Sequence, residues 1–113
     1  MKITFDTVRK FGLQLPDVEE TTSRGAGALT VRGKMLTCEA INKSAEPGSI
    51  VVRMDSAQRD ELIAADPDTY YITDHYLPYP SVLVRLSRVR PEALKDLLRM
   101  SWKYVTTKKG GTK

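Results

Sequence analysis

The sequence has few of the residues that build covalent and metal frameworks. Cys38 is its only cysteine and His75 its only histidine. A lone cysteine excludes an intrachain disulfide and a cysteine-based zinc site, and it fits a reducing, cytoplasmic setting. With no second histidine, a metal site would depend mainly on carboxylates. We therefore expect no metal and no cofactor.

Long hydrophobic runs are also missing. A membrane-spanning helix needs about 20 consecutive apolar residues, and no stretch of the chain approaches that length. The first ten residues, MKITFDTVRK, contain no apolar segment typical of a secretory signal. We expect a cytoplasmic protein with no membrane partner.

What the chain does contain is enough for one folded domain. It has 113 residues, of which 41% are hydrophobic and 28% charged. This size suits a single core and is too small for a two-domain enzyme with a cleft between its domains. We expect one domain over residues 1–105 and a polar, disordered tail over 106–113.

Charge is distributed unevenly along the chain. The net charge is +4, but residues 55–75 carry −5, whereas residues 21–54 carry +3 and residues 76–113 carry +7. A fold that joins the two basic blocks would create a positive face that attracts phosphates or acidic proteins. The simpler alternative is an ordinary solvated surface.

Local patterns predict three helices and six strands. Proline, glycine and alternating apolar residues divide the chain into these segments. A capping box of Asp55 and Gln58 is expected to begin the second helix. Gly12 is expected to end the first helix in a left-handed conformation. The predicted helices are 4–11, 55–66 and 91–105, and the predicted strands are 20–24, 28–31, 35–41, 49–54, 70–72 and 81–87.

The short turns between strands favour an antiparallel sheet. Arg32-Gly33-Lys34 is typical of a hairpin turn in which Gly33 has a positive φ. We predict an α+β fold with two layers, in which three helices pack on one face of the sheet in the order α-β4-α-β2-α.

Two long segments resemble a known family. LPDVEETTSRGAGALTVRGKM is similar to the N-terminal signature of the MmcQ/YjbR family, and ADPDTYYITDHYLPYPSVLVRLSRV resembles its C-terminal half. The combination of LP-x-VEE, RGK, ADP, HY and VLVRLS is fairly specific, and the likeness extends from Phe5 to Trp102.

The resemblance implies a two-layer α+β fold, similar to the frataxin and secretion-chaperone arrangements. It also implies a DNA-binding role of the "double wing" type. Many relatives have a tryptophan just before the last strand, where this chain has Tyr79-Pro80-Ser81. A site that used that tryptophan would be altered here.

Arginines on strands are the leading functional candidates. If Ile50, Val52 and Val84 face the helices, strand alternation places Arg53 and Arg85 on the opposite, open face. Arginine side chains in such a group match phosphate or carboxylate geometry. The alternative for each of them is local pairing with an acid such as Glu20 or Glu39. The predicted DNA contacts are Arg24, Arg32, Lys34, Arg53, Arg85, Arg88 and Lys103.

An aromatic cluster accompanies these bases. His75, Tyr76 and Tyr79 lie close together in the sequence and could stack on bases or contact a ligand. Tyrosines more often pack their rings and bond the hydroxyl at the edge of a core. Alternation predicts that one of Tyr70 and Tyr71 is buried.

Catalysis has little support in the sequence. Alternation places Cys38 on the apolar face with Leu36 and Ala40, which indicates a buried thiol. No serine lies in a nucleophile-elbow sequence. Gly25-Ala26-Gly27 does not precede a helix, as a phosphate-binding loop must.

These patterns favour a small non-enzymatic binding domain, monomeric or weakly dimeric, that contacts the DNA backbone. Two alternatives stay open. A protein-interaction or chaperone-like module would use the same sheet face, with Val51 and Leu83 exposed between the arginines. A small-anion site would use Arg53 and Arg85 with His75 and Tyr76.

Overall fold

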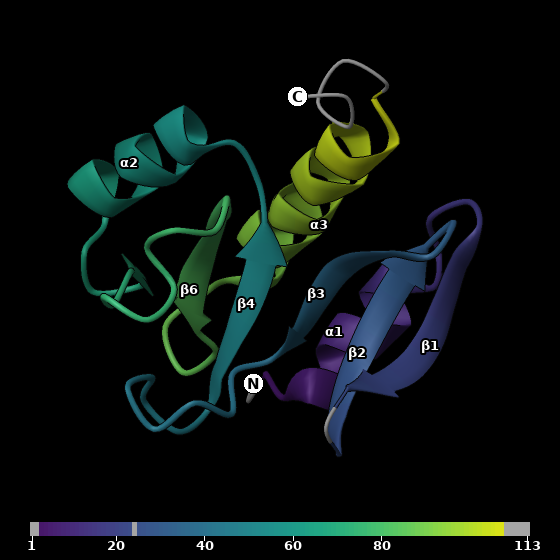
Figure 1. The fold of residues 1–113 in the computed structure, drawn as a ribbon, viewed down its shortest axis with the longest axis horizontal. Coiled ribbons are helices and arrows are strands. Elements are labelled where there is room, and N and C mark those ends of the chain that lie inside the picture. The colour runs from purple at the N-terminus through teal and green to yellow at the C-terminus, as the bar shows by residue number, and fades with distance from the viewer. Residues whose placement is uncertain (1–2, 24, 108–113) are drawn as a thin grey trace.

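The computed structural model describes residues 3–23 and 25–107 (Figure 1). Within them the chain forms three helices and one six-stranded sheet. The elements are α1 (Phe5–Gly12), β1 (Val18–Ser23), β2 (Ala26–Val31), β3 (Lys34–Glu39), β4 (Ser49–Arg53), α2 (Ser56–Ala65), β5 (Tyr70–Tyr71), β6 (Ser81–Arg85) and α3 (Pro91–Thr106).

The sheet is antiparallel throughout, in the order β1-β2-β3-β4-β6-β5. The predicted turn between β2 and β3 is confirmed. Arg32 has a φ of 52° and Gly33 a φ of 80°. Two consecutive residues with positive φ match the right-handed twist of the flanking strands.

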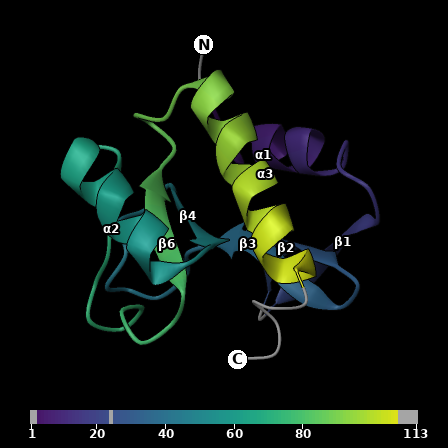
Figure 2. The ribbon, with the colours of Figure 1, turned by 90° about the horizontal axis from the view of Figure 1, so that it is seen from above.

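The helices form the second layer, which confirms the predicted α+β class. Figure 2 shows α1 and α3 over the β2–β4 part of the sheet, with α2 beside β6. The core between the layers contains Leu29, Leu36, Val52 and Val84 from the sheet and Leu97 from α3, all at most 2% exposed. The alternation predicted for Ile50, Val52 and Val84 is therefore confirmed.

Gly12 has a different role from the predicted one. It is the last residue of α1 and has no positive φ, and the following C-cap residue, Leu13, has a φ of −69°. A methyl group at Gly12 would lie 2.3 Å from Leu29 Cδ1. The glycine therefore permits the close approach of α1 to β2, together with the buried side chains of Phe5 and Val8.

The start of α2 also differs from the prediction. Asp55 is the N-cap residue, but its side chain makes no capping hydrogen bond, so the predicted box with Gln58 is wrong. Tertiary contacts hold this helix instead. Leu62 and Ile63 pack against the core, and the buried Arg59 donates a hydrogen bond to the carbonyl of Leu77.

α3 is the longest helix and spans the sheet. Its predicted apolar stripe is confirmed as the buried face. Ser101 Oγ donates to the carbonyl of Leu36 at 3.0 Å, and Trp102 Nε1 donates to the carbonyl of Pro16 at 2.9 Å. The helix continues to Thr106, which is the first residue of the predicted tail, and residues 108–113 of that tail lie outside the described residues.

Candidate functional site

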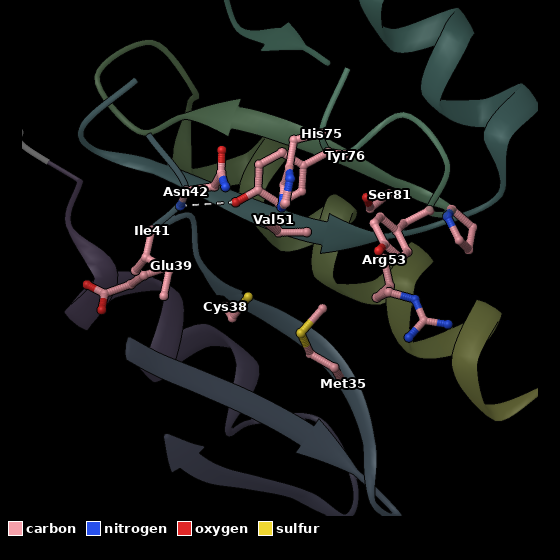
Figure 3. Close-up of a pocket in the computed structure, with 12 residues that line it drawn as sticks. Met35, Cys38, Glu39, Ile41, Asn42, Val51, Arg53, His75, Tyr76 and Ser81 are labelled. Atoms are coloured by element: carbon pink, nitrogen blue, oxygen red, sulfur yellow. Dashed lines mark hydrogen bonds between the residues drawn. The ribbon is translucent and has the colours of Figure 1, made fainter. Parts of the chain in front are cut away.

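A pocket of about 610 Å³ lies on the helix-free face of the sheet (Figure 3). Its floor is formed by side chains of β3 and β4, and the loop between β5 and β6 forms one wall. In Figure 3 the rings of His75 and Tyr76 lie over Val51. The lining residues are Met35, Cys38, Glu39, Ile41, Asn42, Val51, Arg53, His75, Tyr76, Tyr79, Pro80 and Ser81.

Cys38 reaches this pocket because of an irregularity in β3. Leu29 pairs with Thr37 and Thr30 with Met35, so Leu36 is an extra residue in the strand. This β-bulge shifts the alternation by one residue. Leu36 and Thr37 are both buried, and Cys38 lies half-buried in the pocket.

The prediction that Cys38 lies on the apolar face with Leu36 is therefore wrong. Burial raises the pKa of its thiol, and the neighbouring Glu39 carboxylate raises that pKa further. A raised pKa lowers the thiolate fraction near neutral pH. The environment of Cys38 thus disfavours nucleophilic chemistry.

Arg53 is the last residue of β4 and lines the pocket. It pairs with Ser81 across the β4–β6 ladder, so the two side chains are neighbours on one face. Arg53 Nε and Ser81 Oγ are both buried atoms with no hydrogen-bond partner among the described residues. Buried polar atoms in folded proteins nearly always have a partner, so this pair is exceptional.

The hydrophobic residues between the two strand arginines are buried. Val51 is 4% exposed and Leu83 is 0% exposed. The prediction of an apolar, open strip at these positions is wrong. Tyr76 crosses this face, where its hydroxyl accepts a hydrogen bond from the backbone N–H of Asn42. The observation that favoured a protein-interaction face is thereby removed.

Arg85 shares this face but lies at its other end. Arg53 pairs with Ser81, and Arg85 is four residues further along β6, about 13 Å away along the strand. Its guanidinium donates two hydrogen bonds to Glu46, at 2.9 and 2.7 Å, and stacks 4.1 Å from the Tyr71 ring.

Further contacts hold Arg85 in place. Nη1 donates to the carbonyls of Pro67 and Asp68, at 3.1 and 3.0 Å. Its hydrogen bonds lower the pKa of the Glu46 carboxyl. Local pairing, the alternative considered for each arginine, thus describes Arg85, although its partner is Glu46 rather than Glu20 or Glu39. Glu20 pairs with Arg9, and Glu39 accepts from the N–H of Gly27.

The other predicted DNA contacts divide between the two ends of the sheet. Arg88 is exposed and lies near Arg85, since its N–H donates to the Arg85 carbonyl. Arg24 lies outside the described residues. Four bases lie at the opposite end, and we call this group the basic end: Arg32, Lys34, Arg53 and Lys103.

Contacts at Leu36 and the adjacent Thr37 bring the segments of the basic end together. Leu36 lies two residues after Lys34, and Ser101, two residues before Lys103, donates to its carbonyl. Arg53 follows Val52, which pairs with Thr37. In Figure 1 the β2–β3 turn, the tip of β4 and the C-terminal end of α3 lie at the same end of the molecule.

The aromatic candidates form one side of the pocket. His75 packs edge-on against Tyr76 with ring centroids 4.8 Å apart, and Tyr79 is 57% exposed. The expected split of the tyrosine pair is confirmed. Tyr70 is buried and Tyr71 is half-exposed.

Sequence reasoning missed most of the pocket, because Arg53, His75, Tyr76 and Tyr79 are the only predicted site residues among the twelve described lining residues. Val51 and Ser81 could have been found from strand register, because both share a face with Arg53. Cys38 could not, because nothing in the local pattern indicates the bulge. Asn42 and Ile41 lie in a loop whose path only the tertiary structure shows.

Within residues 3–23 and 25–107, no group of three or more histidine, cysteine or acidic side chains could hold a metal ion. None of the helices in this part of the chain is both long and apolar enough to cross a membrane.

Comparison with known proteins decides the family. A model of the YjbR family matches residues 13–104. The chain belongs to the YjbR family. This match confirms the resemblance carried by the two signature segments. It assigns the chain to a family of small domains with a common fold.

Other proteins are similar to this chain over part or most of its length. The uncharacterised proteins Mb2600 of Mycobacterium bovis and Rv2570 of Mycobacterium tuberculosis are each 39% identical over 69 residues, covering 57% of this chain and 54% of theirs. The chain thus spans about half the length of the curated relatives it matches. The crystal structure of Deinococcus radiodurans DR2400, with a DUF419 domain, has a TM-score of 0.76 and 26% identity, covering 94% of this chain and 80% of that one.

Proposed function

We propose that this YjbR domain is a non-enzymatic binding module that contacts the phosphate backbone of DNA through its basic end. The observation that carries the proposal is the convergence of Arg32, Lys34, Arg53 and Lys103 from three separate parts of the chain. Phosphate contacts by such bases supply affinity without sequence information.

The exposure and the hydrogen bonds of the individual bases support the choice of the basic end as the DNA interface. The side chain of Arg32 is 62% exposed and has only a 3.3 Å contact with Asp17. Lys34 and Lys103 are exposed. Arg85 is left out of the proposed interface because its donors already contact Glu46 and two carbonyls. Arg88 would contribute only to a duplex that extends along the whole sheet.

The test is fluorescence anisotropy of a labelled duplex with the double variant Arg32→Asn and Lys34→Gln. Asparagine is chosen because it tolerates the positive φ at position 32. We expect at least a tenfold loss of affinity at low salt, because two phosphate contacts disappear.

The matched control is the double variant Lys10→Gln and Lys43→Gln. It removes the same charge from exposed residues outside the basic end. An affinity close to that of the parent chain is expected for this control. Equal losses in both variants, or no binding by the parent chain at low salt, would overturn the proposal.

A further inference from the structure

We propose that the pocket beside Arg53 is a second site, sharing Arg53 with the basic end, for a small organic carboxylate with an apolar or aromatic body. The proposal does not depend on DNA binding. It rests on the pocket's lining, on its two unpartnered polar atoms and on the exposed hydrophobic side chains at its mouth.

The pocket has the size and lining of a ligand site. Its volume of about 610 Å³ lies within the range of roughly 300–1,000 Å³ for small-molecule pockets. Its floor combines the aliphatic Val51 with the sulfur-bearing side chains of Met35 and Cys38. Tyr76 and Tyr79 add aromatic walls, so the pocket suits a flat or branched apolar body.

Exposed hydrophobic side chains point to the same place. Among the described residues, the large apolar side chains with high exposure are Leu13, Ile41, Leu77 and Tyr79. Ile41 and Tyr79, exposed by 56% and 57%, both line this pocket. A ligand with an apolar body would remove both from water, which is favourable in proportion to the area covered.

The head group follows from Arg53 and Ser81. Arg9, Arg32, Arg59, Arg85 and Arg99 each form an ion pair with an acid, and Arg53 forms none among the described residues. The buried Nε–H of Arg53 and the hydroxyl of Ser81 are neighbouring donors. A carboxylate can accept from both at once, and a guanidinium matches its geometry.

The charge around the pocket favours one negative charge over several. Among the described lining residues, Arg53 is the only arginine or lysine, and Glu39 is the only acid. In Figure 3 Glu39 points away from the centre, and its Oε1 accepts from the N–H of Gly27 at 2.9 Å. A polyanion would be repelled by this carboxylate, whereas a monocarboxylate can place its charge at the Arg53 end.

The test is a titration of the full chain with 3-phenylpropionate. Binding is measured from the NMR chemical-shift changes of the backbone amides and of the Arg53 Nε–H. For a ligand of this size we expect a Kd of roughly 0.1–1 mM. The largest shifts should fall on Val51, Arg53, Tyr76 and Ser81. The neutral 3-phenylpropanamide should bind at least tenfold more weakly, and acetate should produce no saturable shift.

Two variants separate this site from the DNA interface. Cys38→Phe fills the pocket and should abolish the shifts while leaving duplex affinity unchanged. The double variant Arg32→Asn with Lys34→Gln should weaken duplex binding and leave the 3-phenylpropionate shifts unchanged. Arg53→Gln removes the guanidinium and its charge but keeps a polar side chain, and it should weaken 3-phenylpropionate binding at least tenfold, which gives a second measurement if Cys38→Phe does not fold.

Three results would overturn the carboxylate site. They are equal affinity for the acid and its amide, shifts that map away from the pocket, and no saturable shift at about 10 mM probe, tenfold above the weakest expected Kd. Duplex binding by the same sample shows whether a failure belongs to this site alone.

Discussion

Arg53 and Arg85 show how two arginines on one sheet face come to differ. Each directly follows a strand residue that faces the core, Val52 or Val84, and both point to the helix-free side. Arg85 meets Glu46, Tyr71 and two backbone carbonyls. Arg53 meets none of these, and its buried Nε has no partner within residues 3–23 and 25–107. The first arginine therefore stabilises the fold, and the second lacks an acidic partner in the described part of the chain.

The pair of Arg85 and Glu46 predicts a dependence of stability on pH. Hydrogen bonds from Arg85 hold the pKa of Glu46 below its ordinary value of 4.5. A lowered folded-state pKa stabilises the fold above the unfolded-state pKa, and this stabilisation is lost as the pH falls through the folded-state value. Urea unfolding between pH 7 and pH 3 should show a smaller acid loss for Glu46→Gln than for the parent chain.

The control for this prediction is Glu61→Gln on the exposed side of α2, since Glu61 forms no ion pair with any described residue. Its loss of stability towards acid should match that of the parent chain. Parallel pH profiles for the parent and Glu46→Gln would contradict the assignment of a stabilising pair.

Contacts between elements decide where side chains lie in this fold. The extra residue Leu36 in β3 moves Cys38 into the pocket, and the carbonyl of Leu36 accepts a hydrogen bond from Ser101 of α3. Arg59 connects α2 to the loop that carries the pocket's aromatic wall. Gly12 sets the spacing between α1 and β2.

Gly12→Ala tests the α1–β2 contact. The new methyl group would meet Leu29 Cδ1 at 2.3 Å inside the core, so Leu29 must shift. Overpacking of this kind costs about 1–3 kcal/mol. Urea unfolding should therefore show a lower midpoint for this variant, although alanine favours helix by itself.

Lys10→Ala in the same helix is the matched control, because Lys10 is exposed. Its free energy of unfolding should stay within about 0.5 kcal/mol of that of the parent chain. A stable Gly12→Ala variant would show that Leu29 has space to move.

At the scale of the whole molecule, charge is segregated. The acidic block includes α2, which Figure 2 places beside β6. The basic end gathers at the β2–β3 turn, the end of β4 and the end of α3. The net charge is only +4, but the local positive potential at the basic end is stronger than this value suggests. Such a potential steers polyanions towards one surface.

The salt dependence of duplex binding measures the size of that surface. If each of the four bases neutralises one phosphate, the slope of log affinity against log salt should be roughly −3.6 for B-DNA. Arg32→Asn with Lys34→Gln should reduce its magnitude by roughly 1.8. A slope near zero in the parent chain would contradict a phosphate interface.

Much of the fold could be predicted from the sequence, because it depends on local signals. Prolines, turn glycines and apolar alternation indicate the elements, and the Arg32-Gly33 turn follows from local backbone preference. The buried stripe of α3 is a matter of helical spacing. The family signature also lies in the sequence itself. Each of these features depends on residues close together in the chain.

The site required the tertiary structure, because it depends on contacts between distant residues. Only the fold shows that Glu46, 39 residues from Arg85, binds its guanidinium, and that Ser101, 65 residues from Leu36, bonds to its carbonyl. The bulge that redirects Cys38 is set by pairing with β2 and packing of α3. Residue spacing fixes which side chains share a face, but only packing decides which of them a partner already occupies.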